Sequence, residues 1–410
     1  MLRARMRIAL GAFLVAGGSW AATVALAQSA VLAGARSHAI NPDVPAFAAP
    51  SGGITPTVRG NAVYTMTNAA EGNEIVVFDR RSDGQISLRT RVSTGGRGSG
   101  ASLGNQSGLI MSDDGRWLLA VNAGSNDVSL LSIQADTSGS PTPPSPLQLV
   151  SVTRSDGSLP TSVTMHGSLV YVLNAGGPGN VSGFELSTGG TLETLTNSTR
   201  LLGGRANAQP AQVGFNPAGD VLVVTDKTSN TITTFTVGTD GRLSSPIPQP
   251  ASGKTPFGFA FLNDVLVVAE AFSGEANMSA VSSYMVGTDG KLTLISGSVP
   301  TLQSATCWVA IGNKGRSIYT TNTDSGTISQ LALTRAGAVR PIAGNSLVEV
   351  GEDQSAPIDI AQSEDGHFLY VLAAGTGEIV SYSVNPLNGS LTHVQTMPGL
   401  PMSVDGLAAR

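Results

Sequence analysis

The chain has 410 residues, of which 41% are hydrophobic and 12% are charged, and its formal net charge is −5. This acidic balance argues against nucleic acid as a ligand, because nucleic-acid recognition starts from a basic patch. The single cysteine, Cys307, excludes an intrachain disulfide. With 50 glycines and abundant serine and threonine, the composition favours many short strands joined by tight turns.

Residues 1–27 have the pattern of a secretory signal peptide. Three arginines lie within the first seven residues, an apolar run follows up to Leu26, and Ala25-Leu26-Ala27 provides a small-residue cleavage site. A membrane anchor is the alternative, but glycines interrupt the apolar run. No later segment approaches the ~20 apolar residues that a span needs. The sequence therefore predicts a periplasmic or secreted protein with no membrane span after signal removal.

Residues 28–59 contain several prolines and no periodic pattern, which indicates a flexible leader. The remainder, residues 60–410, repeats one unit of about fifty residues. Each unit has an apolar strand, a turn and a second apolar strand, and the residue that closes this second strand can be compared between units. The residues at that position are Asn68, Asn122, Asn174, Asp226, Glu270, Asn322 and Ala373.

Seven such units predict an all-β fold, a seven-bladed β-propeller of four-stranded antiparallel blades. Asp-Gly and Asn-Gly pairs, such as those at 240–241 and 388–389, supply the positive φ angles of tight hairpins. The first unit lacks its own innermost strand, whereas the chain ends in a matching segment, Val404–Ala409. The C-terminus is therefore expected to complete the N-terminal blade and close the ring, which removes two exposed sheet edges.

Two of these segments, 115–122 and 317–322, resemble the lactonase family of seven-bladed propellers, which includes 6-phosphogluconolactonase-like proteins and the fungal carboxymuconate cyclase. The resemblance covers roughly residues 60–410 and implies hydrolysis of a small lactone. It also implies an Arg-His pair just after a proline on an innermost strand, followed by a strand that ends in Glu. Here Pro256 is followed by Phe257 and Gly258, so the pair is absent, whereas Glu270 matches.

Glu270 and Asp226 are the candidate catalytic residues, because they close equivalent strands of neighbouring blades. Paired carboxylates can divide the roles of general acid and base. The alternative is that both residues cap turns, as the asparagines at this position would. The four histidines lie in the leader, in turns or on an outer strand, so a histidine-based mechanism or metal site is not expected.

Four further residues are candidate ligand-binding groups. Lys227 and Arg97 could hold an acidic ligand, Trp308 could stack on a ring, and Asp359 lies on an innermost strand. Each also has a structural alternative, namely solvation for the cations and packing between blades for the tryptophan. Cys307 has no activating neighbour in the sequence, so an inert buried thiol is favoured.

No cofactor is expected, although Asp359 and Asp405 could hold a Ca²⁺ ion in the channel. The expected partner is a small polar molecule, and a protein partner stays open as an alternative. Two functions follow from the sequence. The chain hydrolyses a small lactone or sugar-acid derivative, as the resemblance implies, or it is a non-catalytic binding propeller, as the absent Arg-His pair suggests.

Overall fold

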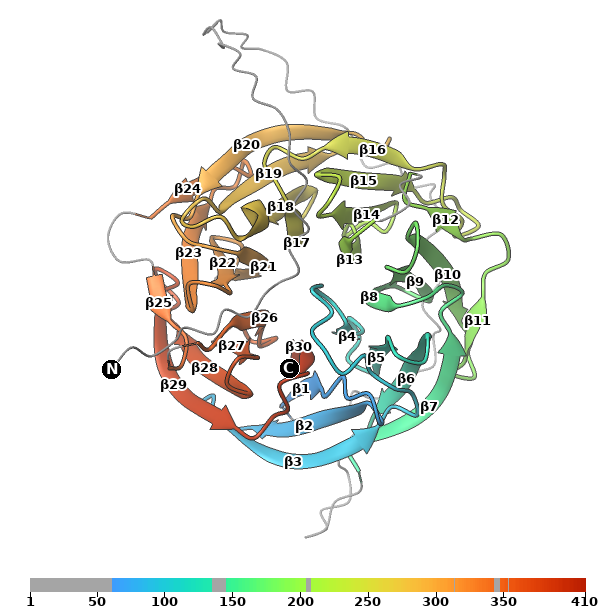
Figure 1. The fold of residues 1–410 in the computed structure, drawn as a ribbon, viewed down its shortest axis with the longest axis horizontal. Coiled ribbons are helices and arrows are strands. Elements are labelled where there is room, and N and C mark those ends of the chain that lie inside the picture. The colour runs from blue at the N-terminus through green and yellow to red at the C-terminus, as the bar shows by residue number, and fades with distance from the viewer. Residues whose placement is uncertain (1–60, 135–144, 204–207, 313, 343–346, 353) are drawn as a thin grey trace, which may run out of the picture. The chain divides into compact units, whose positions relative to one another are not determined.

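The computed structural model describes residues 61–134, 145–203, 208–312, 314–342, 347–352 and 354–410. The predicted signal peptide and leader lie outside these residues. Within them, seven antiparallel sheets surround a common axis as the blades of a β-propeller (Figure 1). The predicted all-β propeller is thus confirmed. The part of the chain that the structure describes holds no helix long and apolar enough to cross a bilayer.

The blades are numbered here in chain order, and their strands are given from the axis outward. Blade 1 contains β30 (Asp405–Ala409), β1 (Ala62–Met66), β2 (Glu74–Arg80) and β3 (Ile86–Ser93), and blade 2 contains β4 (Leu109–Met111), β5 (Trp117–Asn122), β6 (Asp127–Ile133) and β7 (Leu147–Arg154). Blade 3 contains β8 (Pro160–His166), β9 (Leu169–Asn174), β10 (Asn180–Leu186), β11 (Leu192–Thr194) and β12 (Arg200–Leu201). Blade 4 contains β13 (Pro210–Phe215), β14 (Val221–Asp226), β15 (Thr231–Thr236) and β16 (Ile247–Pro250).

Blade 5 contains β17 (Pro256–Leu262), β18 (Val265–Glu270), β19 (Ala280–Val286) and β20 (Leu292–Pro300), with a short 3₁₀ helix η1 (Phe272–Gly274) between β18 and β19. Blade 6 contains β21 (Thr306–Gly312), β22 (Ser317–Asn322), β23 (Thr327–Leu333), β24 (Val339–Pro341) and β25 (Leu347–Glu349), and blade 7 contains β26 (Pro357–Gln362), β27 (Phe368–Ala373), β28 (Glu378–Val384) and β29 (Leu391–Pro398). The outermost strand is therefore continuous in five blades and divided into two short pieces in blades 3 and 6.

The C-terminal strand completes blade 1, as the sequence predicts. β30 pairs antiparallel with β1, so that Ala409 lies opposite Val63. The Thr65 hydroxyl donates to the Gly406 carbonyl at 2.6 Å, and the Arg410 amide donates to the Ala62 carbonyl at 2.8 Å. Both ends of the described chain therefore belong to one sheet, in which β30 is the innermost strand and pairs with β1.

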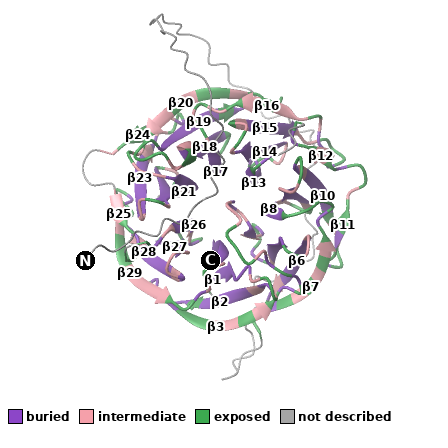
Figure 2. Cartoon of the chain, viewed as in Figure 1, coloured by how far each residue is buried: buried purple, intermediate pink, exposed green. Residues whose placement is uncertain are grey.

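The hydrophobic core lies between adjacent blades. The second strand of a blade is buried on both faces, as in β14, β18, β22 and β27, where every residue is buried, whereas the outer strands alternate toward solvent (Figure 2). Tyrosine hydroxyls on three second strands reach turns of the next blade: Tyr171 to Gly241, Tyr319 to Gly389 and Tyr370 to Gly84. These bonds fix the blades to one another and so fix the geometry at the axis.

Candidate site at the mouth of the axial channel

The innermost strands begin with an irregularity at the same end of the propeller. The pairing register shifts near the start of β8, β13, β17, β21 and β26. A bulge bends its strand and re-aims the side chains beside it. The loops that follow the second strands open at this same end, because each second strand runs antiparallel to its innermost neighbour. We call this end the axial mouth.

Side chains at these bulges join one innermost strand to the next. The Ser162 hydroxyl accepts the Val213 amide at 3.1 Å, and the Gln212 carbonyl Oε1 accepts the Phe259 amide at 2.6 Å. Farther round the ring, Asp359 Oδ2 accepts the Leu407 amide at 3.0 Å. Buried amides need such partners. A polar side chain at this position therefore has a structural task at the blade junction.

Gly258 occupies the same position in blade 5 and has no side chain to offer blade 6. Gln106, which precedes β4, supplies the missing bonds. Its Oε1 accepts the Val309 amide at 3.1 Å and its Nε2 donates to the Val309 carbonyl at 2.9 Å. A Cβ on Gly258 would overlap Gln106 Oε1 and would lie 2.7 Å from the Cys307 carbonyl. In this structure the place where the lactonase resemblance implies histidine is thus filled by Gln106.

Gln106 belongs to residues 103–108, which we call the axial segment. This segment runs in toward the centre of the ring just before β4 (Figure 1). The Gln106 amide donates to the Ala211 carbonyl at 3.0 Å, and the Asn105 carbonyl accepts the Trp308 indole N–H at 2.7 Å. The Ser107 carbonyl accepts the Val163 amide at 2.9 Å. The axial segment therefore contacts blades 3, 4 and 6 at the mouth.

Lys227 is a long basic side chain at this mouth. It follows the last residue of β14, and the equivalent positions of the other six blades are occupied by small residues: Ala69, Ala123, Ala175, Ala271, Thr323 and Ala374. The Lys227 ammonium donates to the Gly104 carbonyl at 2.5 Å and lies 4.9 Å from the centre of the Phe257 ring. Burial lowers the pKa of Lys227 to about 8, against smaller opposing effects of Cys307 and Asp226.

Cys307 and Trp308 start the innermost strand of blade 6 beside this lysine. Trp308 packs on Phe257 with ring centres 4.9 Å apart, and both rings are buried. Burial raises the pKa of the Cys307 thiol to about 12, so the thiol is protonated at neutral pH and is a poor nucleophile. The structure thus places two candidate binding residues, Lys227 and Trp308, against the same ring, that of Phe257.

Glu270 and Asp226 end equivalent strands, as predicted, but their carboxylates serve different partners. Glu270 is fully buried and accepts from the Gly253 amide, the Ser282 hydroxyl and the Ser298 hydroxyl, at 2.8, 2.5 and 2.7 Å. Burial raises the pKa of Glu270, and these three bonds oppose that rise. The Glu270 carboxylate therefore lies against the third and fourth strands of its own blade.

Asp226 caps the turn after β14. Its Oδ1 accepts the Thr228 amide at 3.0 Å and the Ser229 amide at 3.3 Å. Among the described residues, no hydrogen bond joins this carboxylate to that of Glu270, and the division of acid and base roles between them stays a prediction. Turn capping, the alternative considered from sequence, accounts for the contacts of Asp226.

The other two predicted ligand-binding residues, Arg97 and Asp359, have surroundings that differ from those of Lys227. Arg97 is exposed on a loop between blades 1 and 2. Asp359 is buried at the junction of blades 7 and 1, and burial raises its pKa to about 7. Within the described residues, no three His, Cys, Asp or Glu side chains gather as a metal site would require.

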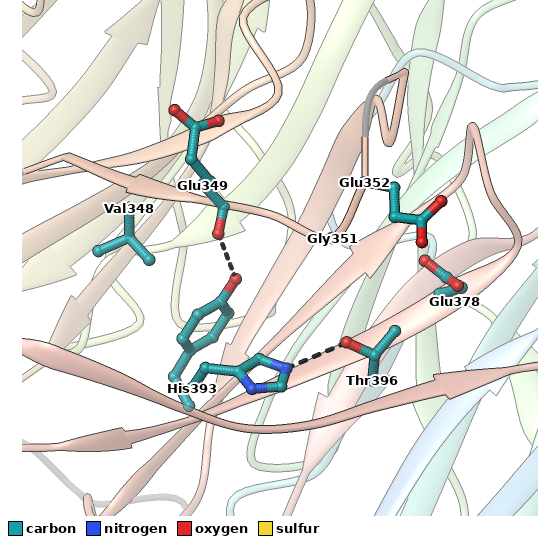
Figure 3. Close-up of a pocket in the computed structure, with 8 residues that line it drawn as sticks. Val348, Glu349, Gly351, Glu352, Glu378, His393 and Thr396 are labelled. Carbon is teal, nitrogen blue, oxygen red and sulfur yellow. Dashed lines mark hydrogen bonds between the residues drawn. The ribbon is translucent and has the colours of Figure 1, made fainter.

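An acidic pocket of about 410 Å³ lies at the outer edge of the ring between strands of blades 6 and 7. Glu349, Glu352 and Glu378 line it, and His393 forms a hydrogen bond to Thr396 at 3.0 Å (Figure 3). The Tyr382 hydroxyl in its wall donates to the Glu349 carbonyl at 2.9 Å. The sequence does not reveal this pocket, because its residues come from outer strands that carry no repeat signature.

Comparison with known proteins supports the lactonase resemblance. The family model described as "Lactonase, 7-bladed beta-propeller" matches residues 167–278, and the described chain has the expected seven blades. No curated protein matches the chain. The chain is thus a seven-bladed propeller in which residues 167–278 are similar to the lactonase family, and gluconolactonases occur among the structures that it resembles.

Two solved structures illustrate this similarity. A proposed 6-phosphogluconolactonase from Bacteroides fragilis superposes with a TM-score of 0.65 at 16% identity, over 87% of this chain and 100% of the other. The periplasmic gluconolactonase of Pseudomonas aeruginosa superposes with a TM-score of 0.63 at 17% identity, over 84% of this chain and 98% of the other. At such identities the similarity establishes the fold, and the chemistry has to come from this chain's own residues.

Proposed function

We propose that this protein hydrolyses a small lactone or sugar-acid derivative at the axial mouth, with Lys227 as the group that binds the reacting carbonyl. The observation that carries this proposal is the position of Lys227. It stands where six other blades have Ala or Thr, and its ammonium lies over the Phe257 ring. The resemblance to lactonase propellers supports the choice of substrate.

In this proposal Lys227 stabilises negative charge. The ammonium donates a hydrogen bond to the lactone carbonyl oxygen, where negative charge develops when water adds to the carbonyl carbon. The ring C–O bond then breaks, the ring oxygen takes a proton, and the product is a hydroxy acid whose carboxylate pairs with the same ammonium. Every atom of this reaction comes from lactone and water, so we propose that no cofactor is required.

Glu270 is poorly suited to activate the water. Both of its oxygens already accept hydrogen bonds from Gly253, Ser282 and Ser298, and the side chain is fully buried. We therefore assign Glu270 a structural role in blade 5 and rest the proposed chemistry on the amine and a water molecule.

A second candidate function has its own supporting observation. Gln106 fills the space beside Gly258 where the resemblance implies a histidine. A propeller without that group could bind a sugar acid at Lys227 without turning it over. The ligand in that case is the sugar acid itself, a small polar anion.

The test is hydrolysis of a panel of five- and six-membered sugar lactones by purified residues 28–410, with Lys227→Met beside Lys254→Met. Lys254 is an exposed lysine whose ion pair with Glu275 spans 3.5 Å, so its loss controls for charge. We expect turnover in the parent and in Lys254→Met, and a loss of about 100-fold or more in Lys227→Met. Binding of gluconate without turnover of any lactone would favour the second candidate. Equal turnover in all three proteins would contradict the role of Lys227.

We also propose that the protein is exported, with residues 1–27 removed. The support is the order of arginines, apolar run and small residues at the N-terminus. N-terminal sequencing of the protein from a periplasmic fraction should give Gln28 as the first residue. Recovery of the uncleaved chain from the membrane fraction would favour the anchor alternative.

A further inference from the structure

The Lys227 ammonium already has an acceptor inside the protein. It donates to the Gly104 carbonyl of the axial segment at 2.5 Å, and it lies 4.9 Å from the centre of the Phe257 ring. Within the part of the chain that the structure describes, Lys227 forms no ion pair. The ammonium is thus held by a neutral backbone carbonyl and an aromatic ring in place of a carboxylate.

A glycine lets the backbone come this close to the ammonium. Gly104 has a φ of 58°, in a region that glycine adopts readily. A Cβ at this position would lie 3.2 Å from Lys227 Nζ, so a side chain would press on the ammonium. Ala101 and Ser102, which lead into the axial segment, are exposed. The axial segment therefore meets Lys227 with bare backbone, at the place that the carbonyl of a ligand would need.

Gln106 fixes the axial segment beside Gly104. Its Oε1 accepts the Val309 amide at 3.1 Å, its Nε2 donates to the Val309 carbonyl at 2.9 Å, and its own amide donates to the Ala211 carbonyl at 3.0 Å. The side chain has room because Gly258 has none. Gln106 is thus a side-chain anchor of the axial segment, and a single substitution can remove it.

We propose that the axial segment regulates the Lys227 site, in that the Gly104 carbonyl occupies the ammonium until a ligand displaces it, and that Gln106 is the positioning residue that keeps the segment closed. This inference rests on the proposed function only in taking Lys227 as the ligand-binding group. A lactone carbonyl can replace the Gly104 carbonyl like for like, and a sugar-acid carboxylate adds an opposite charge. Ligands bind more weakly than they would to an open site, because only the open fraction is competent.

The experiment measures how fast Lys227 in the full chain reacts with trace acetic anhydride from pH 7 to pH 10, with mass spectrometry of its peptides. The parent is compared with Gln106→Ala and Gln395→Ala. Gln395 is a matched control, because its side chain accepts the Ile86 amide at 2.7 Å and donates to the Ile86 carbonyl at 3.1 Å, between the outer strands β29 and β3. The dependence on pH gives two quantities for Lys227, namely its apparent pKa and the limiting rate of its uncharged form.

In Gln106→Ala we expect the limiting rate of Lys227 to rise about tenfold or more, since the loss of two hydrogen bonds shifts an opening equilibrium by about that factor. The apparent pKa of Lys227 should rise from about 8 toward the ordinary lysine range, because opening hydrates the ammonium. Gln395→Ala should match the parent in both quantities. A general loss of stability would instead change both variants alike.

Parental values of both quantities in Gln106→Ala would overturn the proposal. If that variant does not fold, the parent decides against Lys254, whose side chain is 61% exposed. A closed segment requires the limiting rate of Lys227 to be about tenfold or more below that of Lys254, and equal limiting rates would overturn the proposal.

None of these outcomes depends on hydrolysis. If Lys227 responds as expected in a protein that neither hydrolyses lactones nor binds gluconate, the proposed function fails and the closed axial segment stands. If lactones are hydrolysed while Lys227 in Gln106→Ala reacts as in the parent, the regulation by the axial segment fails and the proposed function stands.

Discussion

At the scale of single residues, Lys227 links the fold to the proposed chemistry. Its pKa of about 8 follows from burial, so the amine is charged below that value and neutral above it. An anion such as gluconate should bind more weakly as pH rises through 8, by about tenfold between pH 7 and pH 9. Calorimetric titration of gluconate from pH 6.5 to pH 9.5 measures this.

Lys227→Arg provides the matched variant for that pH dependence. A guanidinium stays protonated throughout the range, so binding to this variant should vary little with pH even if the affinity is lower. A parental profile that is flat, or that Lys227→Arg reproduces, would show that another group titrates.

For Glu270 we predict an effect on stability and not on activity. Its two oxygens accept from one amide and two hydroxyls in a fully buried place. In Glu270→Gln one of those oxygens becomes an NH₂ group that faces donors, so we expect a loss of about 1–3 kcal/mol in the free energy of unfolding. Turnover by the folded variant should stay near that of the parent.

Chemical denaturation and lactone turnover check this, with Asp226→Asn as a comparison at the equivalent strand end. A Glu270→Gln variant with parental stability and no activity would restore Glu270 to the catalytic role that the lactonase resemblance implies.

Some of these residues can be predicted from the sequence, and others cannot. Lys227 stands out by simple alignment of the repeats, because its counterparts are small. Gln106 could not be found in that way. Its importance depends on a contact with Val309, about two hundred residues later in the chain. The burial of Glu270 was equally hidden, since the acceptor role arises from Ser298 on the fourth strand.

At the scale of elements, the repeat predicted the strands well because each second strand is apolar on both faces and the Asp-Gly and Asn-Gly turns are explicit. The glycines of these turns have positive φ, for example 75° at Gly241 and 75° at Gly389. The outermost strands were less predictable. They alternate toward solvent, so in blades 3 and 6 the sequence gives little sign that the strand divides into β11 and β12, or β24 and β25.

The closing strand β30 carries a prediction of its own. Deletion of residues 403–410 removes the innermost strand of blade 1 and leaves backbone groups of β1 unpaired. Each buried backbone group left unpaired costs about 1–3 kcal/mol, so the melting temperature should fall by at least ~5 °C. Deletion of residues 28–55 is the control, and we expect it to have little effect. Equal melting temperatures for the two truncations would contradict closure by β30.

At the scale of the whole molecule, the described chain begins and ends in neighbouring strands of one blade. The Arg410 amide bonds to the Ala62 carbonyl at 2.8 Å, and the Arg80 guanidinium bonds to the Arg410 carbonyl at 2.7 Å. The ring therefore depends on which strands pair and not on where the chain starts. The tyrosine hydroxyls bond to turn carbonyls of the next blade, and such contacts between blades do not depend on the order in which the chain visits the blades.

A circular permutant tests this independence of chain order. In residues 61–410, a short Gly-containing linker would join Arg410 to Asn61, which are close enough for a hairpin connection, and new ends would be opened between Leu387 and Asn388. Leu387 is 84% exposed in the turn between β28 and β29, and exposed turns tolerate new termini. We expect the permutant to keep the β-rich circular dichroism spectrum and to melt within about 10 °C of unpermuted residues 61–410.

The comparison variant is opened between Leu119 and Ala120 within β5, where both residues are fully buried. This cut should prevent folding, because it interrupts a strand that pairs on both sides. If the Leu387 permutant failed to fold while the unpermuted chain folded, closure of blade 1 would depend on free chain ends, and the ring would not be independent of chain order.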